Sequence, residues 1–168
     1  MLPITAPSKI HIHPASSNQV LIAISIINEA ATWLSSKGFQ QWQTGSFEKK
    51  IEDAANREEL YLVKLDDQLA GTFILQWADP SFWGEKPDDA GYIHKLAIRR
   101  RFSAQKLGGF LLNWTEKRVV ATGRKYLRLD CDASNPFINR YYLKAGFSYQ
   151  GKEGNYNLYE KDLLIETF

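Results

Sequence analysis

A strand, a loop and a helix follow one another directly in residues 92–123, and this order constrains the fold more than any other feature of the chain. The apolar run YIHKLAI predicts a strand over residues 92–98. The loop RRRFSAQK follows, and a helix is expected up to Gly123, with Leu107, Phe110, Leu111, Trp114 and Ala121 on its apolar side. The first N–H groups of such a helix lack acceptors and lie at the positive end of its dipole, so this junction can bind phosphate.

The N-terminal third predicts a short strand at residues 9–13 and two helical regions. The first helix runs to Gly38 and places one apolar face at four-and-three spacing, formed by Val20, Ile24, Ile27, Ala31 and Leu34. The second region, residues 39–57, is more polar and less regular. Both helices need a partner surface for their apolar side chains.

The remaining segments predict two hairpins, a strand and a helix. Residues 60–77 read as two apolar strands around a turn at Asp66 and Asp67. Apolar and polar side chains alternate over residues 126–131, as in a strand. Asn135 can cap a helix that ends at Gly146, and residues 147–163 predict a closing hairpin.

The predicted order is strand, two helices, three strands, helix, strand, helix and two strands. Such mixing indicates an α/β (α+β mixed) fold in which helices cover both faces of a sheet. No repeat, low-complexity tract or linker divides the sequence. Residues 1–168 are therefore expected to form a single domain.

Composition narrows the possible partners and the compartment. The 21 basic and 19 acidic side chains leave a formal charge of +2, too weak a field to indicate binding to nucleic acid or a membrane. The longest apolar stretch, residues 20–27, is shorter than a membrane span, and no signal peptide is recognisable. One cysteine, Cys131, excludes an internal disulfide and fits a reducing compartment. We expect a cytoplasmic soluble protein without nucleic-acid or membrane partners, and a homodimer is plausible.

Three groups of residues together resemble the GNAT superfamily of N-acetyltransferases, which use acetyl-coenzyme A. The strand ends in Leu96, Ala97 and Ile98, similar to the LAV-type end of the family. Residues 103–108, SAQKLG, stand where the family has Arg/Gln-x-x-Gly-x-Gly/Ala. Asn135 lies seven residues before Tyr142, which opens the segment YLKAGF. The resemblance implies a GNAT-like fold with a central mixed, mostly antiparallel twisted sheet.

The resemblance also implies a cofactor site for acetyl-coenzyme A. Backbone groups of Leu96 and Ile98 would bind the pantetheine and the acetyl carbonyl, Asn135 would contact the pantetheine arm, and Tyr142 would protonate the leaving thiolate as general acid. The implied cofactor-binding set is Leu96, Ala97, Ile98, Ser103, Ala104, Gln105, Lys106, Leu107, Gly108, Gly109, Asn135 and Tyr142.

The loop departs from the family pattern, because Ala104 and Lys106 replace frequent glycines. We expect its backbone N–H groups to bind the pyrophosphate, with Lys106 either in an αR or bridge conformation or contributing a side-chain contact. Residues 99–101, three arginines, could add contacts to phosphate. The departures leave a second hypothesis open, a catalytically weak or inactive GNAT-like module that binds acyl-coenzyme A or serves in interactions.

The acceptor is expected to be a primary amine of a small molecule or peptide. Its proton must go to a base, for which His94, Glu85, Asp79 and Asp89 are all candidates. The acceptor is expected to bind against Trp33, Trp77 and His94. No metal is expected, because His11 and His13 share a strand face without further ligands at a suitable spacing, and Cys131 reads as a strand-face residue.

Overall fold

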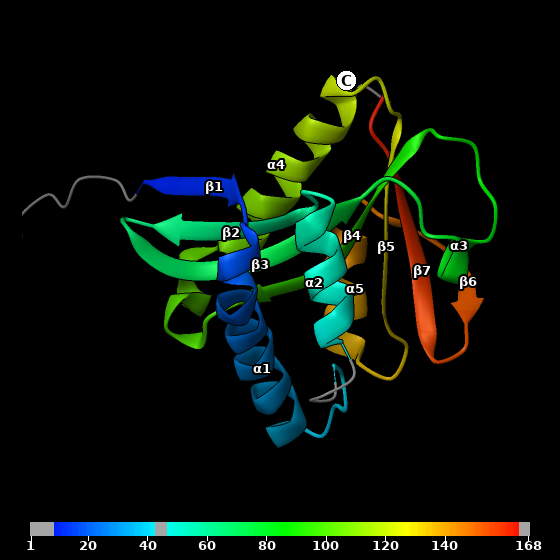
Figure 1. Cartoon of the computed structure of the whole chain (residues 1–168). Coiled ribbons are helices and arrows are strands. Elements are labelled where there is room, and N and C mark those ends of the chain that lie inside the picture. Colours follow the sequence, from blue (N-terminus) through cyan, green and yellow to red (C-terminus); the bar gives the residue numbers. More distant parts are fainter. Residues whose placement is uncertain (1–8, 43–46, 165–168) are drawn as a thin grey trace, which may run out of the picture.

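A seven-stranded sheet in the order β1-β2-β3-β4-β5-β7-β6 forms the centre of the molecule (Figure 1). The structure, a computed structural model, describes residues 9–42 and 47–164. Its strands are β1 Ile10–Pro14, β2 Leu60–Leu65, β3 Gln68–Gln76, β4 Ala90–Ile98, β5 Tyr126–Asp132, β6 Ser148–Glu153 and β7 Tyr156–Asp162. All neighbours pair antiparallel except β4 and β5, which are parallel.

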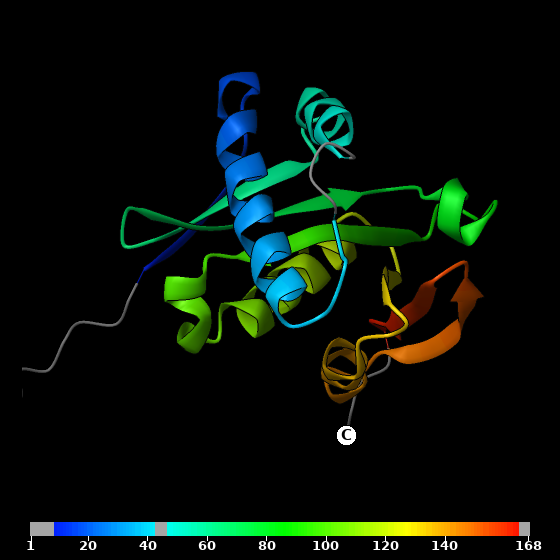
Figure 2. The ribbon, with the colours of Figure 1, turned by 90° about the horizontal axis from the view of Figure 1, so that it is seen from below.

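Helices cover both faces of this sheet. The helices are α1 Val20–Ser36, α2 Glu48–Asn56, α3 Pro80–Trp83, α4 Leu107–Ala121 and α5 Pro136–Lys144, with short 3₁₀ turns η1 Ser17–Gln19 and η2 Arg100–Gln105. Figure 2 shows α1 and α2 on one side of the sheet and α4 and α5 on the other. The predicted mixed fold with helices on both faces is confirmed. No helix of the described residues is long and apolar enough to span a membrane.

Each face of the sheet has its own apolar core. Ile26, Ile51 and Leu62 belong to the core beneath α1 and α2, whereas Val63 and Leu111 belong to the core beneath α4 and α5. Successive residues of β2 therefore point to opposite cores, because side chains alternate along a strand. This burial on both faces explains why residues 60–63 form a continuous apolar run.

Helix faces and turns depart in places from the sequence prediction. Three residues of the predicted face of α1 are buried, namely Val20, Ile27 and Ala31. The helix also buries Ala23, Ile26 and Ala30, whereas Ile24 and Leu34 are half-buried, so its contact face is broader than the predicted one and shifted from it. In α4 the fully buried positions are Leu107, Leu111, Leu112, Thr115 and Val119.

Phe110 is 47% exposed and Ala121 is exposed, so their predicted place on the buried side of α4 is wrong. Apolar character alone did not identify which side of the helix meets the sheet. The short helices α3, η1 and η2 had no periodicity long enough to predict them. In the region 39–57 only α2 is helical, and residues 43–46 of that prediction lie outside the described residues.

The turn chemistry read from the sequence is confirmed. Asp66 and Asp67 have φ values of 49° and 70°, as a two-residue hairpin turn with two left-handed positions requires. Gly123 and Gly146, just after α4 and α5, have φ values of 82° and 95°.

Strands β4 and β5 pair over only part of their lengths. The register runs from Ala90–Tyr126 to Ile93–Leu129 and stops there, although both strands continue. A β-bulge also interrupts the pairing of β3 with β4, because Thr72 faces Ala97 while Ile74 faces His94. One extra residue of β4 therefore lies between these pairs, and the strand bends where its contact with β5 ends.

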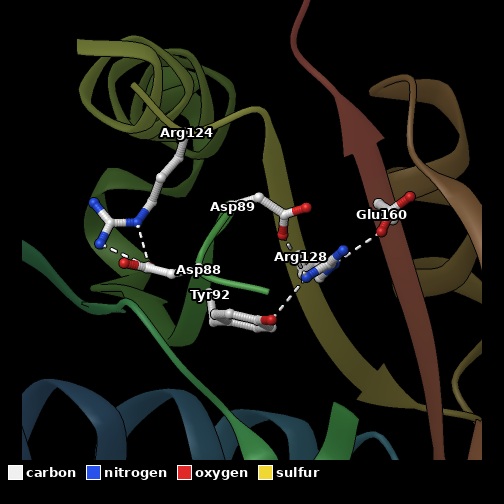
Figure 3. A network of polar contacts seen from close by, with 6 residues as sticks. All are labelled: Asp88, Asp89, Tyr92, Arg124, Arg128 and Glu160. Atoms are coloured by element: carbon white, nitrogen blue, oxygen red, sulfur yellow. Dashed lines mark hydrogen bonds and ion pairs between the residues drawn. The ribbon is translucent and has the colours of Figure 1, made fainter. Parts of the chain in front are cut away.

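Arg128 links β4, β5 and β7 at the paired end of this junction (Figure 3). Its Nη1 donates to the Tyr92 hydroxyl and its Nε to Glu160, both at 2.8 Å, and Asp89 lies at 3.6 Å. The guanidinium also lies 5.3 Å from the ring centroid of Trp83. A buried cation with two carboxylates and a hydroxyl around it holds the three strands at a fixed spacing.

Replacing Arg128 with methionine is expected to lower the free energy of unfolding by about 2–3 kcal/mol, because the carboxylates of Glu160 and Asp89 lose their buried counter-charge. Chemical denaturation measures the change. Arg124→Met is the control, since the Asp88 carboxylate that pairs with Arg124 is 75% exposed, and it should cost less than about 1 kcal/mol. Equal losses in the two variants would contradict this role for Arg128.

Candidate active site

A cleft of about 580 Å³ opens where β4 and β5 diverge. The ends of these strands, the start of α4, helix α5 and residues of α1 and α2 all contribute to its walls. Twelve of the predicted site residues line it: Trp33, His94, Leu96, Ala97, Ile98, Ser103, Lys106, Leu107, Gly108, Gly109, Asn135 and Tyr142. The structure thus brings most of the predicted site into a single cavity.

Three predicted site residues lie outside this cleft. Ala104 and Gln105 are exposed in η2 and do not line it. Trp77 follows β3 and packs against the Arg124 guanidinium, 4.3 Å from its ring centroid. A substituent at Gly91 would lie 3.3 Å from the same Trp77 ring, which places that ring near the paired end of β4. The structure therefore shows no contact of Trp77 with the cleft.

The entrance to α4 presents backbone donors to one end of the cleft. Lys106 caps the helix with φ 56° and ψ 32°, so the expected αR or bridge conformation is wrong. A residue with a Cβ is strained in this left-handed region, which explains why a glycine is frequent at this position in the family. Leu107, Gly108 and Gly109 then begin the helix, where N–H groups have no intrahelical acceptor.

Gly108 also allows α4 and α5 to approach each other closely. A Cβ at Gly108 would lie 2.8 Å from the Tyr141 hydroxyl oxygen. Both residues line the cleft, so a larger side chain at position 108 would enter it. Of the three consecutive arginines, only Arg100 lines the cleft, and its guanidinium lies 3.7 Å from the Trp33 ring centroid.

The edge of β4 that faces β5 forms one wall. From His94 to Ile98 this edge has no partner strand among the described residues, because the pairing with β5 ends at Ile93. Unpaired strand edges carry free N–H and C=O groups. Leu96 and Ile98, the predicted backbone contacts of the cofactor, lie in this stretch.

Asn135 and Tyr142 bring helix α5 into the cleft. The side-chain Oδ1 of Asn135 accepts hydrogen bonds from the N–H groups of Phe137 and Ile138, at 3.0 and 3.3 Å. Its Nδ2 donates to no described residue, so the predicted cap leaves an amide donor for a ligand. Structural capping and ligand binding are thus compatible at this residue.

Tyr142 is held by an aromatic cluster and keeps its proton. Its ring packs edge-on against Phe147, with centroids 5.7 Å apart, and the side chain is buried. Burial, followed by the nearby Cys131 and Tyr141, raises the pKa of the Tyr142 phenol well above its usual range. Burial likewise raises the pKa of the Cys131 thiol to about 12. Tyr142 is therefore a proton donor at neutral pH, and the Cys131 thiol is a poor nucleophile.

His94 lies between two carboxylates. Its Nε2 is 2.9 Å from Asp79 Oδ2, and its Nδ1 is 3.4 Å from Asp130 Oδ1. Burial raises the pKa of Asp130, and the neighbouring His94 opposes this shift. His94 and Asp130 line the cleft, whereas Asp79 lies behind the imidazole.

These three side chains are close enough to suggest a metal, since their ligand atoms lie within 4.8 Å of one another. The two carboxylates, however, contact different nitrogens of the His94 ring. An ion bound by both carboxylates could take only one of these nitrogens as a ligand. The arrangement suits proton transfer through the imidazole better than chelation. Glu85 is exposed and Asp89 contacts Arg128, and neither lines the cleft.

Two lysines that sequence reasoning missed also line the cleft. Lys95 is the extra residue of the β4 bulge and has φ 54°. Its Nζ lies 5.4 Å from the ring centroid of Trp42 and 5.5 Å from that of Phe47. Burial, together with Lys50, lowers the pKa of Lys95 to about 8, and Asp130 opposes this shift. The sequence pattern of a strand does not reveal a bulge, so it could not be predicted that the Lys95 side chain points into the cleft.

Comparisons with known proteins agree with this geometry. The sequence pattern of the acetyltransferase (GNAT) family matches residues 27–147. The chain is 28% identical to the uncharacterized N-acetyltransferase YesJ of Bacillus subtilis (strain 168) over 151 residues, which cover 84% of this chain and 83% of the relative.

Solved structures share the whole fold. A GNAT-family acetyltransferase from Listeria monocytogenes 4b F2365 superposes with a TM-score of 0.79 at 27% identity, over 91% of this chain and 94% of that one. The PaiA N-acetyltransferase of Thermoplasma acidophilum, solved in complex with coenzyme A, gives a TM-score of 0.75 at 19% identity, over 92% and 99% of the two chains. The chain therefore belongs to the acetyltransferase (GNAT) family.

Proposed function

We propose that this protein transfers an acetyl group from acetyl-coenzyme A to a primary amine by direct attack in a ternary complex. One observation carries the proposal: the cleft between β4 and β5 combines a helix N-terminus, an unpaired strand edge and a protonated tyrosine. Phosphate, amide and leaving thiolate are the three parts of acetyl-coenzyme A that these groups fit. Membership of the family supports acyl transfer in general.

The cofactor would lie along the cleft from α4 to Tyr142. The first N–H groups of α4 would bind the pyrophosphate, and Arg100 would add charge near the phosphates. The free edge of β4 and the Asn135 amide would hydrogen-bond the pantetheine arm. This placement leaves the thioester beside Tyr142 and the end of the cleft that His94 lines.

The reaction would then proceed with one proton acceptor and one proton donor from the protein. His94 takes a proton from the ammonium of the acceptor, and Asp79 stabilises the resulting imidazolium. The amine nitrogen attacks the thioester carbon, forming the C–N bond, and an N–H group on the β4 edge stabilises the oxyanion. When the C–S bond breaks, the thiolate takes the phenolic proton of Tyr142, and the newly bonded nitrogen gives its second proton to solvent, which leaves a neutral amide. Solvent returns a proton to Tyr142 and removes the one on His94.

The proposal is tested by incubating the protein with acetyl-coenzyme A and a panel of primary amines while measuring release of free thiol. At least one amine should give turnover and an N-acetylated product detectable by mass spectrometry. Binding of acetyl-coenzyme A without turnover on any amine would instead support the binding-module hypothesis. Addition of EDTA should leave turnover unchanged, because no step uses a metal.

Tyr142→Phe is expected to lower kcat by about 10²-fold or more, because general acid catalysis contributes on the order of 10²–10⁴. Binding of acetyl-coenzyme A should persist, since the ring and its packing remain. Tyr149→Phe is the control, because it removes a phenol at the edge of the same aromatic cluster, on β6. Unchanged turnover in Tyr142→Phe would contradict the general acid assignment.

His94→Gln should lower kcat/KM by about 10²-fold at neutral pH, because the amine loses its proton acceptor. The matched control is His11→Gln, which changes an exposed histidine of β1. Thermal denaturation confirms that both variants fold. If His94→Gln keeps the turnover of the parent protein, the base lies elsewhere.

Gly108→Val should weaken binding of acetyl-coenzyme A by about tenfold or more, roughly 1.4 kcal/mol, since the new side chain enters the cleft beside Tyr141. Phe110→Val serves as the control for a β-branched residue in the first turn of α4, because Phe110 is largely exposed. Isothermal titration calorimetry measures both. Equal affinities in the two variants would show that the cofactor does not approach Gly108.

A further inference from the structure

Two lysines converge on the part of the cleft that His94 lines. Lys50 comes from α2, and its Nζ lies 6.0 Å from the Phe82 ring centroid. Lys95 comes from the bulge of β4 and lies over Trp42 and Phe47. All of these residues except Phe47 line the cleft. Phe82 also neighbours His94, with ring centroids 6.3 Å apart, so the lysines stand near the proposed base.

Neither lysine forms a close ion pair with a residue that the structure describes, although the Asp130 carboxylate interacts with both at longer range. Among the described residues, no carboxylate oxygen lies within 4.0 Å of Nζ of Lys50 or Lys95. Two other cations that are not fully exposed do have close partners, Lys161 with Glu116 and Arg128 with Glu160. An ammonium removed from water without a partner is unfavourable, and an anion brought beside it relieves that cost.

The backbone conformation at Lys95 directs its side chain into the cleft. Lys95 adopts a left-handed conformation, which glycine would adopt without strain. The bulge lets both His94 and Lys95 line the cleft, although successive residues of a regular strand point to opposite faces. The strand thereby presents a proton acceptor and a cation side by side.

Negative charge lies beside the lysines, on the wall of the cleft that His94 and β5 form. Asp130 of β5 contacts His94 from the cleft side, and Asp79 lies behind that ring. The acceptor end therefore carries two carboxylates next to the imidazole and two ammonium groups from α2 and the bulge. A molecule with an ammonium and an anion would match both sets of charges, whereas a polyamine would meet two unpaired cations.

We propose that Lys50 and Lys95 bind an anionic group of the acceptor, so that the substrate is a primary amine that also bears a carboxylate or phosphate. The inference rests on the proposed function, because it assigns the acceptor class of the same cleft. The ammonium of the acceptor faces Asp130 and His94, and its anion faces the two lysines.

Matched acceptors test this class directly. L-Phenylalanine is compared with L-phenylalaninamide, and O-phosphoethanolamine with ethanolamine, using release of free thiol from acetyl-coenzyme A; putrescine represents polyamines. At least one anionic member should have a kcat/KM about tenfold or more above its uncharged partner, and putrescine should be the poorest acceptor. A carboxylate and a phosphate are distinguished by which pair shows the difference.

Lysine variants then locate the effect. Lys50→Met and Lys95→Met should each raise KM for the preferred anionic acceptor by about tenfold, and leave KM for acetyl-coenzyme A and kcat/KM for the uncharged partner within about threefold. Lys49→Met is the control, because Lys49 is 87% exposed on α2 and pairs with Asp53. Lys95→Arg restores a cation and should recover part of the loss.

Two failures can be told apart. If uncharged or cationic amines are the better acceptors, or if the lysine variants affect both members of a pair equally, the anion site is wrong while acetyl transfer stands. If no amine is acetylated although acetyl-coenzyme A binds, the proposed function fails, and this inference fails with it.

Discussion

The separation of β4 from β5 after the Ile93–Leu129 pair is the constraint on which the rest of the structure depends. If these two parallel strands stayed paired, there would be no cleft between α4 and α5 and no free strand edge for a ligand to contact. Arg128 holds the paired end, through Glu160 and Tyr92. The bulge at Lys95 bends the other end away. A buried charge network and a strained backbone position thus act on the two ends of the same strand junction.

Most of the fold followed from local patterns, because strand alternation, helix caps and turn residues are properties of short segments. The turn at Asp66 and Asp67, the cap at Asn135 and the ends at Gly123 and Gly146 all lie where the sequence predicts them. The divergence of β4 from β5 is different, since it depends on which residues of two distant segments pair and where that pairing stops. No periodicity within either segment predicts where the pairing stops.

The candidate site likewise contains residues that local sequence patterns predict and residues that they do not. Asn135 and Tyr142 lie seven residues apart, about two turns of α5, so the family spacing places both on the cleft side of one helix. The resemblance to the family places Trp77 on the acceptor side, yet its ring packs against Arg124. The sequence does not predict that Lys50 and Lys95 share a site, because α2 and the β4 bulge meet only in the folded chain. The sequence also marked Lys106 as unusual, and its left-handed conformation gives the physical reason.

Isothermal titration of acetyl-coenzyme A into the folded protein tests the central claim most directly, because both catalysis and acceptor choice require the cofactor in the β4–β5 cleft. We expect saturable binding with one site per chain, and displacement by coenzyme A, whose phosphates and pantetheine use the same contacts. The absence of binding by protein that denaturation shows to be folded would contradict the account.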